Sequence, residues 1–181
     1  MLEKYALYKA LSTLINIPQN YSVRGLARTA KMSASTAKAC LDYLFSKKII
    51  NRAIIGRTYQ YSLSVNFLTK HIRILYSLAE IANSGLVEEL TKKHREITAV
   101  VLYGSAARGE DNHKSDIDIL AVSSKKAIIL PLKAEEHIKR EVTFLNYTTS
   151  EWRAKAKSDK VFYDRIILDG IPLFGEIPAV I

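Results

Sequence analysis

Hydrophobic residues recur at helical spacing through the first part of the chain, and two short strand-like runs follow them. The pattern predicts helices at 2–15, 23–30 and 34–47 and strands at 50–55 and 58–64. Pro18 ends the first helix, and Ser33 or Ser35 caps the third. Gly56-Arg57 forms the turn between the strands. This part of the chain therefore predicts a small domain of three helices and a hairpin.

A longer apolar stripe runs from Asn66 to Asn83 at helical spacing, and Asn83-Ser84-Gly85 then ends the pattern. We interpret 66–84 as a connecting helix between one domain at 1–65 and another at 85–181. The stripe must be covered, either by the first domain or by a second copy of the chain. Core packing is the default interpretation, and a homodimer is the alternative.

The second domain is predicted to mix strands with helices. Expected strands lie at 100–103, 116–120 and 141–147, and expected helices at 86–95, 127–139, around 151 and at 160–168. Thr149 or Ser150 would cap the helix around Glu151, and 171–175 forms a short closing segment. Three aromatic residues are interpreted as core: Trp152, Phe162 and Phe174. The predicted fold class is α+β, with two domains, the second being a mixed β-sheet flanked by helices.

Two polar motifs lie next to strands of this domain. Gly104-Ser105 follows an apolar strand, and Asp116-Ile117-Asp118 follows ten residues later. Gly104 has no Cβ, so a phosphate can approach the backbone, where the N–H and hydroxyl of Ser105 can donate to it. Because side chains alternate along a strand, Asp116 and Asp118 share one face and can ligate the same divalent cation. The motifs therefore predict a phosphate and metal site.

Further groups flank these motifs. Arg108 and Ser115 are candidate partners of the phosphate and of the metal shell. A helix that starts near Ala106 would add its positive end to the same side. Gly-Ser and Asp-x-Asp are each common, so their joint occurrence at this spacing carries the interpretation.

The stretch GSAARGE from Gly104 to Glu110, followed by Ser115-Asp116-Ile117-Asp118, resembles the motif of the nucleotidyltransferase superfamily that includes DNA polymerase β. It is most similar to the minimal prokaryotic branch, and the resemblance covers about Ile97 to the C-terminus. It implies that a nucleoside monophosphate is transferred from a nucleoside triphosphate to a hydroxyl group. It further implies Mg²⁺, or Mn²⁺, held by Asp116 and Asp118.

The superfamily's two-metal mechanism usually takes a third carboxylate from a neighbouring strand. The only acid of the predicted strand 141–147 is Glu141, which stands at its very start. Glu141 either reaches the metal with its longer arm and acts in catalysis or is a solvated residue. Without a third acid the general base is missing, and only nucleotide binding would remain.

Charge is distributed unevenly along the chain. Up to Ser84 there are 12 Lys or Arg and 3 Asp or Glu, whereas the remainder holds 15 of each. All of the net charge of +9 therefore lies in the first part. A basic domain of this kind is typical of a surface that faces nucleic acid.

The order of helix, helix, turn, helix and basic hairpin resembles the winged helix-turn-helix family of DNA-binding domains. The resemblance covers about Leu2 to Ser64, and it implies double-stranded DNA as a partner. The start of the third helix would enter the major groove, and the hairpin would contact phosphates or the minor groove. The candidate DNA-binding residues are Ser35, Thr36 and Lys38 on the helix and Arg52, Arg57 and Tyr59 on the hairpin.

Composition restricts the setting of the protein. The 181 residues are 48% hydrophobic, but no apolar run reaches the length that spans a membrane. The single cysteine, Cys40, excludes an internal disulfide and suits a reducing compartment, so we expect a cytoplasmic protein. Cys40 falls on the apolar face of its helix, where it is expected to pack.

Two functions of different classes follow. In the first, the protein is an enzyme that transfers a nucleoside monophosphate and is recruited by its basic domain to DNA or to a partner. In the second, it is a transcriptional regulator whose second domain binds nucleotide or a partner without turnover. Minimal nucleotidyltransferases often pair with a small helical toxin, so the resemblance adds an antitoxin-like role to this second class.

Overall fold

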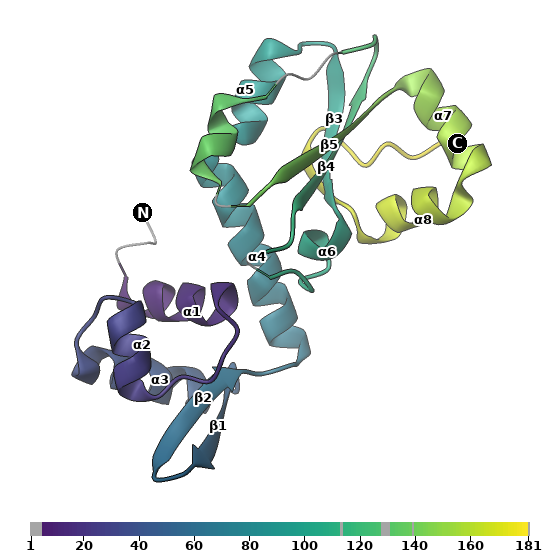
Figure 1. Ribbon diagram of the computed structural model, residues 1–181. Helices are drawn as coiled ribbons and strands as arrows, with labels where there is room; N and C mark the ends of the chain where they lie inside the picture. Colours follow the sequence, from purple (N-terminus) through teal and green to yellow (C-terminus); the bar gives the residue numbers. More distant parts are fainter. Residues whose placement is uncertain (1–4, 113, 128–130, 139, 181) are drawn as a thin grey trace. The chain divides into compact units, whose positions relative to one another are not determined.

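The chain divides into two units, Met1–Ile72 and Arg73–Ile181, and the division falls inside the long helix α4 (Phe67–Ser84). The computed structural model in Figure 1 describes residues 5–112, 114–127, 131–138 and 140–180. The division lies within the range 66–84 that was predicted as a connecting helix. Among the described residues, no helix has both the length and the apolar character needed to cross a bilayer.

The first unit contains three helices and an antiparallel hairpin. They are α1 (Ala6–Asn16), α2 (Val23–Thr29), α3 (Ala34–Ser46), β1 (Ile50–Ile55) and β2 (Thr58–Leu63). Ser33, not Ser35, caps α3, because its hydroxyl accepts a hydrogen bond from the Thr36 N–H at 3.0 Å. The start of the first predicted helix, at Leu2, lies outside the described residues.

The core of this unit joins the three helices to the root of the hairpin. Its buried residues include Ala10, Leu14, Leu26, Ala37, Cys40, Leu41, Leu44, Ile50 and Tyr61. Backbone hydrogen bonds of 2.8 Å in both directions between Tyr21 and Tyr61 hold β2 against the segment before α2. The rest of the hairpin extends into solvent, and Ile54 near its tip is 70% exposed. Cys40 packs in this core, as its position on the helix predicted.

The second unit is built on a four-stranded sheet in the order β5-β4-β3-β6. The strands are β3 (Ile97–Tyr103), β4 (Ile117–Ser123), β5 (Val142–Thr148) and β6 (Ile171–Phe174). β3 pairs antiparallel with both β4 and β6, whereas β4 and β5 run parallel. The mixed sheet predicted for this part of the chain is therefore confirmed.

Helices cover both faces of this sheet (Figure 1). The end of α4 and α5 (Leu86–Lys93) pack with Val100, Leu102, Ile117 and Ile119 on one face. On the other face, Trp152 of α7 (Thr149–Ser158) and Ile166 of α8 (Lys160–Asp169) pack with Val101, Leu120 and Val122. Alternation along β4 therefore places Asp118 on the α8 face, opposite Ile117 and Ile119.

The predicted helix at 127–139 is wrong for the described residues, where a 3-10 helix at Lys133–His137 is found instead. Residues 128–130 and 139 lie outside the described residues. Tertiary contacts override local helix propensity here, because the Glu89 carboxylate accepts hydrogen bonds from the N–H groups of Lys133 at 3.2 Å and Ala134 at 2.8 Å. These hydrogen bonds attach the start of the 3-10 helix to α5.

Two smaller predictions also fail. Thr148, not Thr149 or Ser150, caps α7: its hydroxyl accepts from the Glu151 N–H, and the Glu151 carboxylate accepts from the Thr148 N–H at 2.7 Å. This reciprocal capping box fixes the helix start directly at the end of β5. Trp152 is buried as predicted, but Phe174 is 43% exposed because it lies on the edge strand β6.

Candidate functional site

The two predicted motifs meet where β3 ends beside β4. Gly104 follows β3 with a φ of +73°, a conformation that glycine adopts without the steric penalty of a Cβ. Asp118 pairs in register with Tyr103, so its carboxylate lies beside this turn. A Cβ at residue 104 would lie 2.9 Å from Asp118 Cγ and closer still to Oδ2. The absence of a side chain at Gly104 is therefore what leaves room for the Asp118 carboxylate.

A cavity of about 340 Å³ opens at this point. One wall consists of the β3 end and the turn, with Tyr103, Gly104, Ser105 and Arg108, together with Asp118 of β4. The opposite wall is a face of α8, with Phe162, Arg165, Ile166 and Asp169. The cavity thus combines an open backbone turn, two guanidinium groups and two carboxylates, those of Asp118 and Asp169.

Burial shapes the electrostatics of this cavity. Burial, followed by the neighbouring charge of Asp116, raises the pKa of Asp118, while Arg108 acts in the opposite direction. Burial also raises the pKa of Tyr103 to about 12, and the charge of Asp118 adds to this shift. Tyr103 therefore stays neutral at physiological pH, and the surroundings of Asp118 disfavour its negative charge, as its raised pKa indicates.

Asp116 lies immediately before β4 and is exposed. Its effect on the pKa of Asp118 shows that the two carboxylates are electrostatic neighbours, as their spacing predicted. The donor chemistry fits a divalent cation: the Asp118 carboxylate lies beside the Gly104 turn, and the exposed Asp116, two residues earlier, is outside the cavity lining but offers a second hard oxygen donor. Asp116 and Asp118 are the residues that would hold it.

Glu141 is placed apart from the cavity lining. It is exposed and precedes β5, and its carbonyl oxygen accepts a hydrogen bond from the Ile117 N–H at 2.8 Å. Within the described part of the chain, no three His, Cys, Asp or Glu residues are grouped as a metal site. The residue of β5 in register with Asp118 is Thr143, which has no carboxylate. Of the three predicted acids, only Asp118 lines the cavity; Asp116 acts on its pKa from outside the lining, and Glu141 is not among the groups that shift that pKa.

Arg108 and Ser115 take different positions. Arg108 lines the cavity, and its Nε donates to Glu110 at 2.8 Å. The Ser115 hydroxyl accepts from the Asn112 N–H at 3.0 Å and closes a turn, so it is used in the loop before Asp116. The expected helix at Ala106 is only the single turn α6 (Gly104–Ala107). Its few residues add little macrodipole, so the local N–H groups and Arg108 remain as the candidate groups for binding an anion.

The comparisons agree with this geometry. The family model described as polymerase beta nucleotidyltransferase matches residues 86–176, half of the chain. The chain belongs to this family. No curated protein and no solved structure matches the sequence of this chain. The matched range begins at α5 and ends just beyond β6, so the nucleotidyltransferase domain includes the whole four-stranded sheet and both walls of the cavity.

The α8 wall of the nucleotidyltransferase domain was missed from the sequence. Arg165 and Asp169 lie four residues apart on one helix face, but nothing in their spacing relates them to motifs some 50 residues earlier. Phe162 was predicted as core; it contacts Tyr103 edge-to-face at 5.8 Å between ring centroids and also lines the cavity. The amphipathic pattern of α8 predicted a helix but not which cavity its polar face would border.

The candidate DNA-binding residues all lie in the first unit. Ser35 and Thr36 hydroxyls hydrogen bond to the Ser33 cap at 2.8 and 2.7 Å, and Lys38 pairs with Asp42 at 2.5 Å. The Arg52 guanidinium stacks between the rings of Phe45, at 4.4 Å, and Tyr59, at 4.6 Å. Arg57 is exposed beside the turn at Gly56. Arg52 is thus held in place by two rings, whereas Lys38 is partly neutralised.

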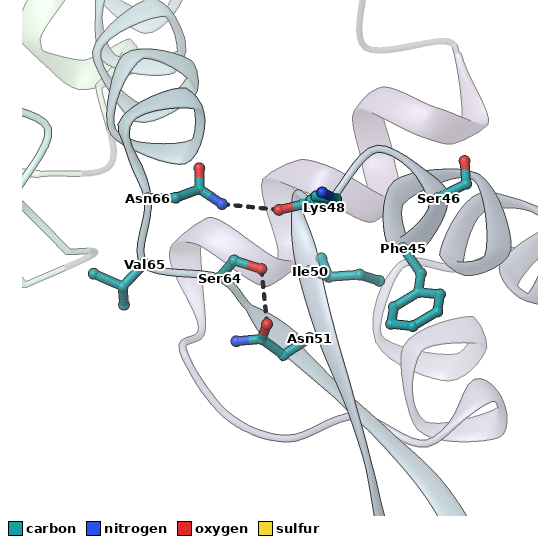
Figure 2. A pocket seen from close by; sticks show the side chains of 8 residues that line it. All are labelled: Phe45, Ser46, Lys48, Ile50, Asn51, Ser64, Val65 and Asn66. Carbon is teal, nitrogen blue, oxygen red and sulfur yellow. Dashed lines mark hydrogen bonds between the residues drawn. The ribbon is translucent and has the colours of Figure 1, made fainter.

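A second cavity, of about 660 Å³, lies at the root of the hairpin (Figure 2). Two hydrogen bonds join residues that line it: the Asn66 amide donates to the Lys48 carbonyl at 2.9 Å, and the Ser64 hydroxyl donates to Asn51 Oδ1 at 3.1 Å. The remaining lining residues are Phe45, Ser46, Ile50 and Val65. This cavity contains one cation and no carboxylate, so it lacks the donors that define the site beside Gly104.

Proposed function

We propose that this protein transfers a nucleoside monophosphate from a nucleoside triphosphate to an acceptor hydroxyl group, with Mg²⁺ or Mn²⁺ held by Asp116 and Asp118. The observation that carries the proposal is the close approach of the Asp118 carboxylate to the Gly104 turn. That approach brings a candidate metal ligand and a phosphate-binding backbone into one cavity. Family membership adds support, since polymerase beta-type nucleotidyltransferases typically use divalent metals and nucleoside triphosphates.

In this proposal, different residues bind the phosphate oxygens and the metal. The N–H and hydroxyl of Ser105 donate to phosphate oxygens that approach the open side of Gly104, and Arg108 adds a positive charge next to them. Asp116 and Asp118 would hold the metal, which would supply positive charge to offset the negative charge on the phosphate oxygens. The acceptor hydroxyl gives its proton to water as its oxygen bonds to the α-phosphorus, the bond from that phosphorus to the oxygen bridging it to the β-phosphorus breaks, and pyrophosphate leaves.

The proposal is tested with α-labelled ATP, the other nucleoside triphosphates and Mg²⁺. The wild-type protein should release pyrophosphate and give a labelled product, and Asp118→Asn should lower the rate on the order of 10²-fold or more. Asp164→Asn is a matched control, because Asp164 also lies on α8 but does not line the cavity and pairs with Lys160. Equal loss in both variants would refute a specific role for Asp118.

A second candidate function rests on the position of Glu141. Because Glu141 does not line the cavity and Thr143 occupies the register position beside Asp118, β5 does not supply the third carboxylate that was expected from it. In this alternative the domain binds nucleotide without turnover, and the protein is a regulator or an antitoxin-like partner of a helical protein. Nucleotide binding by calorimetry without pyrophosphate release would favour it. Restoration of activity by Thr143→Asp would instead show that only the acid is missing.

For the first unit we propose a winged helix-turn-helix that binds double-stranded DNA. Three observations support this: the order of three helices and a hairpin, the charge excess, and the stacked guanidinium of Arg52. A gel-shift series at rising salt tests it, because phosphate contacts release counterions and binding should weaken steeply. Binding that is absent or insensitive to salt would indicate a protein-binding surface, for which a second copy of the chain is one partner to measure by light scattering.

A further inference from the structure

A buried network of ion pairs links α4 to the loop before Asp116. Arg140, which precedes β5, pairs through Nη1 with Asp111 Oδ2 and through Nη2 with Glu80 Oε2 at 2.9 Å. The Ser77 hydroxyl on α4 donates to Asp111 Oδ2 at 3.0 Å and lies 3.0 Å from Arg140 Nη2. The side chains of Arg140 and Asp111 are each only 6% exposed. Two opposite charges are therefore held in the interior of the second unit.

Stability alone is a weak reason for such a network. Removing both charges from water costs several kcal/mol per ion, and well-packed apolar residues often stabilise a fold as much as a buried ion pair does. Asp111 Oδ1 is also buried without a hydrogen-bond partner in the described part of the chain. What the network does provide is geometric specificity, because the donors of a planar guanidinium point in fixed directions and their partners must lie along them.

The arrangement that it selects is that of the loop leading to Asp116. The Asp111 carbonyl accepts a hydrogen bond from Arg73 of α4, so backbone and side chain of Asp111 are both held. Asn112 and Ser115 then close a turn: the Asn112 N–H donates to Ser115 Oγ at 3.0 Å, and the Ser115 N–H donates to the Asn112 carbonyl at 2.9 Å. Asp116 follows this turn directly, so an anchored Asp111 limits where its carboxylate can lie.

Arg140 also acts from the other side of the loop. It precedes Glu141, whose carbonyl accepts the Ile117 N–H and thereby pairs with the residue after Asp116. The chain at 140–141 thus meets both segments that flank Asp116, through the Arg140 guanidinium at Asp111 and through the Glu141 carbonyl at Ile117. Asp118 needs no such support, because it lies inside β4 between the buried residues Ile117 and Ile119. The exposed acid of the pair is the one that depends on the network.

We infer that Arg140 and Asp111 are positioning residues for the metal site: their buried pair holds the Asp116 loop so that Asp116 and Asp118 can bind one divalent cation together. This inference rests on the proposed metal-dependent function. It concerns residues outside the cavity that touch neither nucleotide nor metal. The class of ligand that it serves is a divalent cation with hard oxygen ligands.

Two mild variants test the inference without leaving a buried charge unpaired. Arg140→Lys keeps the positive charge but replaces the three separate nitrogens that contact Asp111, Ser77 and Glu80 with one, and Asp111→Asn keeps the shape but loses the charge. Glu89→Gln is the matched control. Glu89 likewise anchors a loop to a helix of the same unit, through Lys133 and Ala134, but that loop does not carry Asp116.

Two measurements are made on the full chain without nucleotide. Mn²⁺ binding is followed by electron paramagnetic resonance, and amide hydrogen exchange is followed over residues 112–118. Both network variants should raise the Mn²⁺ dissociation constant about tenfold, the lower end of the effect of outer-shell residues on metal affinity. They should also speed exchange in 112–118, whereas Glu89→Gln should leave both quantities at the wild-type value.

The outcomes separate the possible failures. Exchange and Mn²⁺ affinity that stay at wild-type values in both network variants overturn the positioning role. Faster exchange with unchanged Mn²⁺ affinity also overturns it, because the loop would then be loosened without consequence for the metal. Failure of the wild-type protein to bind Mn²⁺ refutes the proposed metal site itself and is seen before any variant is compared.

Discussion

The two units of this chain use charge in opposite ways. Residues 73–181 hold 16 basic and 16 acidic residues, and several of these form internal pairs such as Arg140 with Asp111. Residues 1–72 hold 11 basic and 2 acidic residues, and Arg52 is held by aromatic rings rather than by a carboxylate. Charge that is balanced inside a fold positions groups, whereas unbalanced charge on a surface is available to a large anionic partner.

The largest expected effect comes from breaking the glycine turn in the second unit. Gly104→Ala places a Cβ against the Asp118 carboxylate, so we expect activity to fall on the order of 10²–10³-fold. Gly85→Ala is the matched control, because Gly85 has a φ of +75° but no atom within 4 Å of an added Cβ. Both variants should lose about 1–2 kcal/mol of unfolding free energy from the left-handed backbone. Equal activity in the two would remove the special role of Gly104.

In the first unit, Arg52→Ala should weaken DNA binding roughly fivefold near physiological salt and reduce the salt slope by about one. Arg57→Ala should have a smaller effect, because Arg57 is at the exposed turn and no ring stacking on it is seen among the described residues. Fluorescence anisotropy over a salt series measures both. Arg52→Lys is the informative third variant, since lysine keeps the charge but lacks the planar group that stacks between two rings. Lysine matching arginine would argue for charge alone.

A smaller effect is expected from Asp42, one of the two acids of the first unit. Asp42→Asn releases Lys38 from its ion pair on the surface of α3. DNA binding should become tighter by about twofold, with a slightly steeper dependence on salt. The double variant Asp42→Asn with Lys38→Ala is the control and should lose this gain. A gain that persists in the double variant would point to the general charge of the unit rather than to Lys38.

The smallest effect concerns stability and pH in the metal-free protein. Burial raises the pKa of Asp118 above its ordinary value of 3.8, so ionising it in the folded state is unfavourable, and the unfolding free energy falls as pH rises through that value. Asp118→Asn should therefore raise Tm at pH 7 but not at pH 3. The pKa of Glu151 shifts in the opposite direction: the hydrogen bond from the Thr148 N–H and the pairing with Lys126 lower it to about 2.

Glu151→Gln should accordingly lower Tm at pH 7, and the difference from wild type should shrink as pH falls from about 4.5 toward 2. Thermal unfolding by circular dichroism at several pH values measures both variants. Shifts of the same sign in the two variants would contradict the assigned causes. Added Mg²⁺ should raise Tm in the wild type but not in Asp118→Asn, because only the wild type gains a ligand in the folded state.

The sequence by itself determined the features that depend on short stretches of chain. Apolar spacing located the helices and strands, and the Gly104-Ser105 and Asp116-x-Asp118 motifs indicated the site, because side-chain alternation and glycine geometry are local properties. Local pattern failed where distant partners decide. Glu89 of α5 bonds to the start of the 3-10 helix at 133–137, some 45 residues away. The α7 cap is a different kind of miss, because the capping box of Thr148 with Glu151 is itself a local pattern.

Only the tertiary structure decided which distant residues share one space. The α8 wall with Arg165 and Asp169, the register that places Thr143 beside Asp118, and the pairing of Arg140 with Asp111 each join segments tens of residues apart. The physical reason is that side-chain types and spacing specify what an element is, while sheet order and the packing of buried faces specify what it meets. Charge showed the same limit: its excess was visible in the sequence, but the ring stacking of Arg52 and the burial of Arg140 required the fold.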